Sequence, residues 1–337
     1  MVESPLFLCD SPAVDELSEV FDVIETRGQV TGAFAARGRW VARSFSRTPL
    51  KLTVMARGRA RLSADGLDAP VHLEEGDVAI LNDRSWLELE GGSGDGPVQE
   101  IEPEITDLVA GVLTAGPDCD LVVGGRVLLN RAGEDLLLQA LPPVGHVRAK
   151  AAEATRLRVI VNQIVDEVTA ARMGSGFAVR QYAQLLVLEV LRAYVGQAQL
   201  PPGRLRALTD ARLRPAVSRM HAEPGRPWKL EELAHAAAMS RTSFAERFRA
   251  VAGVPPLTYL SGWRMLLAQR ALGDGDVRVG AIAADLGYTS ESAFSTAFKR
   301  EVGESPLRYR ARIHEDRIHE EQSATKPTSV HPGRHRR

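Results

Sequence analysis

Hydrophobic residues follow two different spacings along this chain, and the spacing changes several times. Near the N-terminus they recur every three or four positions, which predicts a helix, at Val14, Leu17, Val20, Phe21 and Ile24. Between about 30 and 130, short apolar segments alternate with turn signals, at 50–54, 60–63, 71–73, 78–81 and 86–89. Many short strands at regular spacing predict a β-sandwich or a small barrel.

Helical spacing returns at about 150 and continues to 195. Its first part has an apolar stripe, whereas its second part, 182–194, is apolar over most of its circumference. Such a helix has to be covered, either by the core of its own chain or by the same helix of a second copy. Residues 197–204 then break the pattern with two prolines and a glycine, which predicts a linker.

Residues 208–312 have a helical pattern throughout. They contain two copies of one sequence pattern, fifty positions apart. The first copy reads SRTSFAERFRAVAGVPPLTYL from Ser240, and the second reads SESAFSTAFKREVGESPLRYR from Ser290. Each copy begins with a serine suited to cap a helix and follows a shorter helical segment after a tight turn. The arrangement predicts two helix-turn-helix motifs, at about 230–251 and 279–301, which is the architecture that places a helix in the major groove of DNA.

The second helix of each copy has a buried and an exposed face by its periodicity. Phenylalanines four positions apart, such as Phe294 and Phe298, point inward. Small, polar or cationic residues lie on the opposite face: Thr242, Glu246 and Arg249 in the first copy, and Ser292, Ser295, Thr296 and Lys299 in the second. These residue types bind base edges or phosphates. One such face is equally typical of a solvated helix, but two in register favour DNA.

An amphipathic helix at 259–272 connects the copies and is expected to hold them rigidly apart. Two recognition helices on one side of B-DNA would have to be about one turn, ~34 Å, apart. A solenoid is the rival interpretation, but solenoids need at least three repeats, and this chain has two.

Charge divides the chain at the linker, although the whole 337-residue chain has a net charge of −1. Lys and Arg minus Asp and Glu is 19 − 28 = −9 for residues 1–203 and 23 − 15 = +8 for residues 204–337. The basic half fits a nucleic-acid partner. Two domains that differ only in surface charge are the alternative.

Cysteine content and hydropathy suggest where the protein works. Cys9 and Cys119 are the two cysteines, so the sequence has no disulfide framework, and two incidental thiols are favoured over a redox sensor. No stretch reaches the ~20 apolar residues of a membrane span, and the N-terminus does not resemble a signal peptide. We expect a cytoplasmic protein without a membrane partner.

The sequence predicts no catalytic residues, no cofactor and no metal site. Residues 1–203 contain only His72 and His146, which form no H-x-H pair, and the glycine-rich loop at 91–96 lacks the Lys-Ser/Thr of a phosphate loop. Four histidines between 314 and 335 match no compact metal site. Residues 313–337 are expected to form a solvated, disordered tail.

Residues 228–310 resemble the DNA-binding domain of the AraC/XylS family of bacterial transcription regulators. The stretches LEELAHAAAMSRTSFAERFRAVAGVPPLTYL and IAADLGYTSESAFSTAFKREVGESPLRYR carry the resemblance. It implies recognition helices at about 241–250 and 291–300 in adjacent major grooves. The contacts that it implies are Arg241, Thr242, Ser243, Glu246, Glu291, Ser292, Ser295 and Thr296.

The chain departs from the family pattern at Thr296, where the family often has arginine, so the second unit is expected to bind DNA more weakly. Arg264, on the connecting helix, is either a contact to the DNA backbone or a surface charge.

Residues 1–203 are similar to the cupin-type sensing domain of one branch of this family. The similarity rests on the helix at 15–27, the segments LTVMARGRARL and LEEGDVAIL, and the leucine-rich helices that follow. Lys51, Thr53 and Trp86 stand where the metal-binding histidines of cupin enzymes would be expected, so metal-dependent catalysis is not predicted.

Together these patterns predict an α+β multidomain protein. A cupin-like β-barrel or jelly roll occupies 1–146, a helical extension and linker 147–203, and an all-α DNA-binding domain with two helix-turn-helix motifs 208–312. The predicted function is a sequence-specific transcription regulator, an activator by resemblance, with promoter DNA, RNA polymerase, a small-molecule effector and a second copy of the chain as partners. A cupin-fold enzyme and an effector-independent architectural DNA-binding protein are the alternatives.

Overall fold

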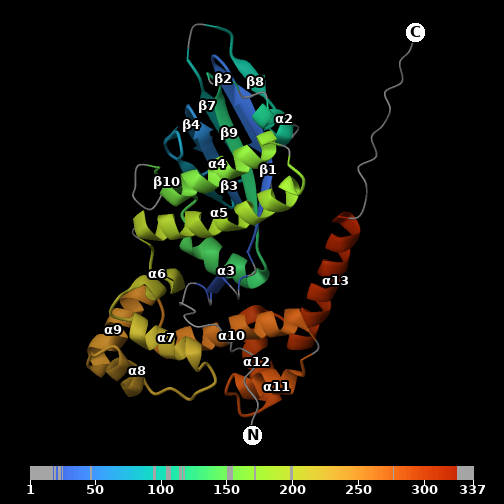
Figure 1. The fold of residues 1–337 in the computed structure, drawn as a ribbon. Coiled ribbons are helices and arrows are strands. Elements are labelled where there is room, and N and C mark those ends of the chain that lie inside the picture. The colour runs from blue at the N-terminus through green and yellow to red at the C-terminus, as the bar shows by residue number, and fades with distance from the viewer. Residues whose placement is uncertain are drawn as a thin grey trace. The chain divides into compact units, whose positions relative to one another are not determined.

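The computed structural model describes residues 18, 20, 21, 24, 26–45, 48–93, 96–103, 108–113, 116, 118–149, 155–170, 172–197, 200–275 and 277–324 (Figure 1). Cys9, Val14 and Leu17 lie outside them. The chain forms two compact units. Asp15–Arg214 and Glu246–Val254 belong to a β-rich unit, and Pro215–Ala245 and Pro255–Arg337 belong to a helical unit.

The β-rich unit contains ten strands in two five-stranded sheets among its described residues. The first sheet has the order β1-β9-β3-β6-β10, with β1 Arg27–Ala36, β9 Asp120–Leu128, β3 Leu50–Arg57, β6 Val78–Asn82 and β10 Val144–Val147. The second has the order β5-β4-β7-β2-β8, with β5 Val71–Glu74, β4 Arg59–Ala64, β7 Trp86–Gly91, β2 Trp40–Phe45 and β8 Gln99–Ile101. Strands β2 and β8 are parallel, and the other pairs are antiparallel.

The two sheets form the sandwich that the strand pattern predicted. Their inner faces share one buried cluster, which includes Phe34, Trp40, Met55, Leu62, Leu73, Leu81, Leu89 and Val122. Strands β3 to β7 contain the five predicted apolar segments. The apolar pattern did not single out β1, β2, β8, β9 and β10, nor the short helices α2 Leu108–Leu113 and α3 Arg131–Ala140.

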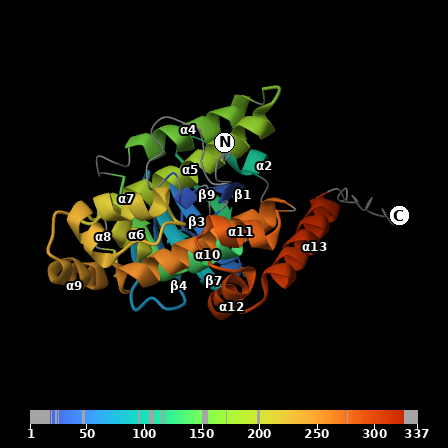
Figure 2. The same cartoon turned by 90° about the horizontal axis from the view of Figure 1, so that it is seen from below.

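Two longer helices, α4 Thr155–Ala170 and α5 Ser175–Gln197, pack against each other and cover the first sheet. Figure 2 shows α4, α5 and the strands as successive layers. Helix α5 contacts β1 directly: the side-chain oxygen of Gln184 accepts a hydrogen bond from the Gly28 amide at 2.9 Å. The sheet therefore covers one side of the apolar helix, while Phe177 and Leu185 remain exposed.

The next two helices are α6 Arg204–Thr209, which belongs to the β-rich unit, and α7 Arg214–Ala222. They are followed by α8 Leu230–Ala236, α9 Arg241–Ala252, α10 Pro256–Asp274, α11 Val279–Asp285, α12 Glu291–Val302 and α13 Pro306–Ala324. Prolines at the first position start α10 and α13, because their missing N–H needs no partner there. Within the described residues, no helix is both long and apolar enough to cross a membrane.

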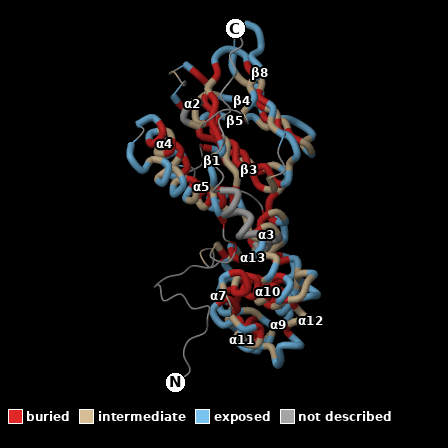
Figure 3. Tube along the Cα trace, turned by 90° about the vertical axis from the view of Figure 1, so that its right-hand side faces the viewer, coloured by how far each residue is buried: buried red, intermediate tan, exposed pale blue. Residues whose placement is uncertain are grey.

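Helix α10 is not the amphipathic connector that its sequence predicted. Buried residues occur on almost all its sides, including Tyr259, Trp263, Leu267 and Gln269. The helix packs against α11, α12 and α13, and His221 of α7 stacks on Trp263 at a centroid distance of 3.8 Å. Figure 3 shows this concentration of burial along α10. The polar residue Gln269 is therefore buried in protein, so the helix has no continuous solvent-exposed polar face of the kind that an amphipathic helix has.

The prediction of a disordered tail from residue 313 is wrong for residues 313–324, because α13 continues to Ala324. Residues 313–324 contain neither proline nor glycine, so nothing in the sequence interrupts a helix that starts at Pro306. The remaining tail, 325–337, lies outside the described residues.

Candidate nucleic-acid interface

Helices α9 and α12 start and end in the same way. The Ser243 amide donates to the side-chain oxygen of Ser240 at 3.2 Å, and the Ala293 amide donates to that of Ser290 at 3.1 Å, so the predicted N-caps are confirmed. Each helix ends at a glycine with positive φ, Gly253 at 74° and Gly303 at 91°. The repeated sequence thus builds two helices of twelve residues each.

The turns that precede these helices are also alike. The Met239 amide donates to the Ala234 carbonyl at 2.9 Å, and the Tyr288 amide donates to the Ala283 carbonyl at 2.9 Å. The residue before each amide has a left-handed backbone: Ala238 has φ 50° and Gly287 has φ 75°. Both are helix-turn-helix geometries, with one extra residue between the helices in the second.

Burial repeats position by position along α9 and α12. Phe244, Phe248, Phe294 and Phe298 are 0% exposed, which confirms that the phenylalanine faces point inward. Nine of the ten candidate contacts on the two helices are exposed, and Ser295 is half-buried: Arg241, Thr242, Ser243, Glu246, Arg249, Glu291, Ser292, Ser295, Thr296 and Lys299. Each helix therefore presents one polar face.

Intramolecular contacts restrict some of these side chains. Arg241 forms an exposed ion pair with Glu231 at 3.0 Å, which water and salt weaken. The Thr296 hydroxyl donates to the Ser292 carbonyl one turn earlier, at 2.9 Å, so its proton is committed within the helix. Arg249 and Lys299 lie at equivalent positions in the last turn of each helix.

Two cations near this face were not predicted from the sequence. Arg300 is exposed and pairs with Glu301 at 3.2 Å. It directly follows the predicted contact Lys299, and this adjacency is the feature of the sequence that could have identified it. Arg247 of α9 donates to Asp210 at 2.7 Å. Burial raises the pKa of Asp210, but the Arg247 hydrogen bond and the Leu213 amide outweigh burial, and the pKa lies below its usual value. Arg247 therefore ties the part of α9 that belongs to the β-rich unit to Asp210 of the same unit.

The guanidinium of Arg264 binds the backbone of the loop that follows α7. Its Nε donates to the Pro224 carbonyl at 2.6 Å, and one terminal nitrogen donates to the Arg226 carbonyl at 3.0 Å. Burial lowers the pKa of this guanidinium. These bonds hold residues 224–226 against α10, and the Arg264 side chain is half-buried.

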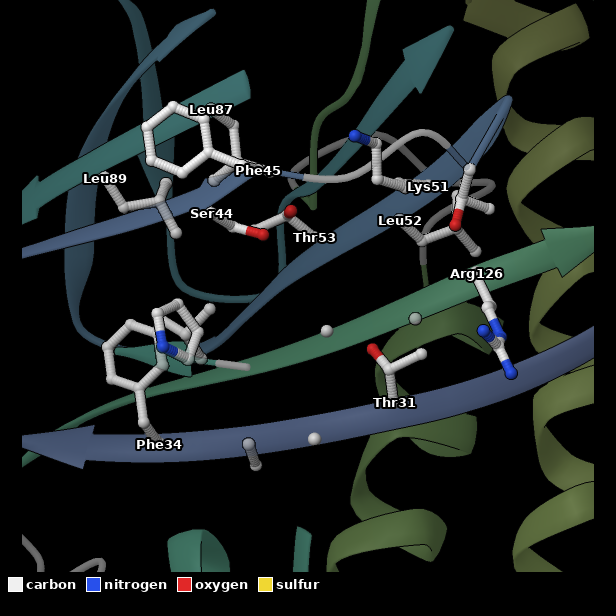
Figure 4. Close-up of a pocket in the computed structure, with 17 residues that line it drawn as sticks. Thr31, Phe34, Ser44, Phe45, Lys51, Leu52, Thr53, Leu87, Leu89 and Arg126 are labelled. Atoms are coloured by element: carbon white, nitrogen blue, oxygen red, sulfur yellow. The ribbon is translucent and has the colours of Figure 1, made fainter. Parts of the chain in front are cut away.

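A second candidate site is a cavity of about 290 Å³ between the sheets of the β-rich unit. Figure 4 shows Lys51 and Thr53 of β3, which stand where cupin enzymes would have metal-binding histidines, together with Arg126 of β9 and Phe34 of β1. His146 lies elsewhere, with its Nε2 2.8 Å from Asp77. The described residues contain no group of three or more His, Cys, Asp or Glu side chains that could hold a metal ion.

Comparisons with known proteins match both halves of the chain. A cupin family model matches residues 15–196, and a helix-turn-helix domain model matches residues 233–312. An AraC-like transcription regulator of Streptomyces lividans is 34% identical over 88% of this chain and 98% of its own length. One of Streptomyces antibioticus is 35% identical over 88% and 98%. The RCS-specific transcriptional activator RclR of Escherichia coli is 31% identical over 72% and 77%.

Proposed function

This chain belongs to the AraC family of DNA-binding transcription regulators, and we propose that it recognises promoter DNA by placing α9 and α12 in adjacent major grooves. The observation that carries the proposal is the repeated polar face. Two capped helices of equal length bury the same phenylalanine positions and expose the same polar positions. Side chains of these types bind base edges and phosphates.

The contact residues divide by chemistry. Glu246 accepts a hydrogen bond from cytosine, and Thr242, Ser243, Ser292 and Ser295 bond base edges or phosphates. Other contacts come from Arg241, Arg249, Glu291, Thr296 and Lys299. We leave Arg264 out of this set because its guanidinium already donates to two carbonyls. The α12 face is the weaker one, because Thr296 commits its proton to Ser292 and Lys299 is the one cation among its proposed contacts.

The regulatory role that we propose is activation, with RNA polymerase as the protein partner, in response to a small molecule in the β-rich unit. The name of RclR, which describes an activator, supports the direction of control. The cavity between the sheets supports the effector. The apolar side chains Phe177 and Leu185, exposed on α5, are compatible with a homodimer. Because the matched relatives are named as regulators, we infer a regulatory and not a catalytic role.

The test is selection of bound fragments from the source genome with the full-length chain, followed by hydroxyl-radical footprinting. We expect a selected sequence with two protected segments about 10 base pairs apart, one for each helix. A shuffled duplex of the same composition is the control, and affinity for the selected duplex should exceed it by about 10³ or more. Equal affinity for the two duplexes would refute sequence-specific recognition, and one protected segment would refute the two-groove arrangement.

A further inference from the structure

A strongly basic segment lies between the two parts of the chain that match known families. Residues 204–219 contain five arginines and one acidic residue, Asp210. Their net charge of +4 is half of the +8 of residues 204–337. The segment follows the cupin match, which ends at 196, and precedes the helix-turn-helix match, which begins at 233. Much of the positive charge of the C-terminal half therefore lies outside both matched domains.

Helix α6, in this segment, runs beside the C-terminal half of α9 (Figure 1). At one end of α6 the Gly203 amide donates to the Val251 carbonyl at 3.0 Å. At the other end Arg247 donates from Nε and from a terminal nitrogen to the Asp210 carboxylate, at 3.2 and 2.7 Å. Because Arg247 and Val251 are about one turn apart on α9, residues 203–210 lie against that turn. These residues all belong to the β-rich unit.

The one carboxylate of the segment is occupied by other donors. Besides Arg247, the Arg212 and Leu213 amides donate to Oδ1 of Asp210, each at 3.1 Å. Three arginine side chains of the segment are exposed, and we call them the flanking arginines: Arg206, Arg212 and Arg214. None of the three forms an ion pair in the part of the chain that the structure describes. Their charges are therefore not neutralised within the described protein.

The start of α7 adds to this positive charge. Arg214 is the first residue of α7, and the first turn of the helix contains no acidic residue. The N-terminus of a helix carries a partial positive charge, which favours a nearby anion and disfavours a cation. Arg212 lies two positions earlier, so two guanidinium groups and the helix dipole act together. The segment is thus suited to a negatively charged partner.

Continuity with α9 favours DNA phosphate as that partner. Helix α9 exposes Glu246 and Arg249, which are proposed above to contact DNA. A helix in the major groove, which is about 12 Å wide, has a phosphate strand on each side. An element that packs along such a helix lies close to one of these strands, where arginine side chains bind phosphate oxygens. An acidic protein surface would not explain why the arginines lie alongside α9.

We propose that the flanking arginines Arg206, Arg212 and Arg214 bind the phosphate backbone of DNA beside α9. This proposal rests on the function proposed above and extends the DNA-binding surface beyond the two helix-turn-helix motifs. Because phosphates carry no sequence information directly, these contacts add affinity without adding specificity.

The second motif has no equivalent of the flanking arginines. The residues fifty positions after the segment 204–214, at 254–264, contain one arginine, Arg264. Its guanidinium donates to the Pro224 and Arg226 carbonyls. The additional phosphate contacts therefore belong to the first motif and add to the difference in strength proposed between α9 and α12.

The test is fluorescence anisotropy of the full-length protein at several salt concentrations, with the selected duplex and its shuffled control. We expect the combined variant Arg206→Ala, Arg212→Ala and Arg214→Ala to lower the slope of log affinity against log salt by about two to three, since each phosphate contact contributes about 0.9. Affinity should fall by the same factor, about ten- to hundredfold, for both duplexes. An unchanged slope, or a loss confined to the selected duplex, would overturn the proposal.

Two control variants separate phosphate binding from other effects. Lysine at the same three positions keeps the charges and should preserve the slope, because an ammonium group also binds phosphate. Arg59→Ala removes an exposed arginine of β4 and should leave the slope unchanged. All variants should melt at the temperature of the unmodified protein, because the replaced side chains are exposed. A loss that lysine does not restore, or an equal loss in Arg59→Ala, contradicts the assignment.

Phosphate-ethylation interference tests the position of these contacts. Ethylation of phosphates that border one protected segment, the one where Glu246→Ala changes base preference, should weaken the unmodified protein but not the combined alanine variant. Equal sensitivity of the two proteins would place the flanking arginines away from DNA. Equal affinity of the unmodified protein for selected and shuffled duplexes would instead refute the function proposed above, and the salt slopes would still report on the flanking arginines.

Discussion

The backbone of Gly225 lies directly against that of Gly287, in the turn of the second helix-turn-helix motif. A methyl group on Gly287 would lie 2.0 Å from the Gly225 carbonyl oxygen, and one on Gly225 would lie 2.2 Å from the Asp285 carbonyl oxygen. Arg264 holds the neighbouring carbonyls of Pro224 and Arg226. The loop after α7 is therefore part of the support for the turn that orients α12.

Replacement of Gly287 by alanine should destabilise the helical unit for two reasons. The left-handed φ of 75° costs about 1–2 kcal/mol for an L-residue, and the methyl group also displaces the Gly225 backbone. Gly303→Ala is the matched control, because it has a φ of 91° but meets open space. Urea denaturation should show a clearly larger loss of unfolding free energy for Gly287→Ala than for Gly303→Ala. Equal losses would mean that the contact with Gly225 does not contribute.

The first motif has alanine where the second has glycine, and this difference predicts a stabilising substitution. Ala238 has φ 50° and is exposed. Ala238→Gly removes the left-handed strain and should raise stability by about 0.5–1 kcal/mol. Ala250→Gly, at an exposed position inside α9, should lower stability by a similar amount. Opposite shifts of the melting temperature are expected, and a fall in both variants would contradict the strain at Ala238.

Local patterns were sufficient to predict the elements of the candidate interface. The serine caps, the buried phenylalanines and the helices themselves depend on residues three or four positions apart, and β3 to β7 depend on alternation within short segments. Such signals lie within one element, so a single sequence contains them.

Features that depend on distant partners could not be predicted. The opposition of Lys51 and Arg126 requires the register of β3 against β9, which no local pattern specifies. The hydrogen bonds from Arg264 to the Pro224 and Arg226 carbonyls could not be predicted either, because backbone acceptors have no sequence signature. Burial on almost all sides of α10 likewise follows from the helices packed around it.

Stability of the β-rich unit should fall in acid because of Asp77. Burial by itself raises the pKa of this carboxyl, but hydrogen bonds with His146 and from the Ala149 and Glu74 amides outweigh burial and hold the pKa below its usual value. Since the folded pKa is depressed, the stabilisation is present above the unfolded pKa of about 3.9 and is lost as pH falls through the folded value. Melting temperatures between pH 7 and 3 should show this decline.

Asp77→Asn tests the assignment of that decline. The free energy of unfolding of the variant should be about 1–3 kcal/mol lower at pH 7, because buried donors lose a charged acceptor. Its melting temperature should change less with acid than that of the unmodified protein. Asp68→Asn, at an exposed position of the β4–β5 loop, should leave both quantities unchanged. An unaltered pH profile in Asp77→Asn would assign the acid sensitivity to other groups.

Arg249 and Lys299 occupy equivalent positions on α9 and α12, so they allow the two proposed recognition helices to be compared. Arg249→Ala and Lys299→Ala should each weaken binding to all sequences and reduce the slope of log affinity against log salt by about one, because each removes a phosphate contact. Glu246→Ala should instead change base preference at one position. Fluorescence anisotropy at several salt concentrations, with Arg43→Ala as the control for loss of an exposed cation, measures these effects. We expect Arg249→Ala to lose more DNA affinity than Lys299→Ala. A larger loss of DNA affinity for Lys299→Ala would contradict the inference, drawn from the Thr296 to Ser292 hydrogen bond, that α12 binds DNA more weakly than α9.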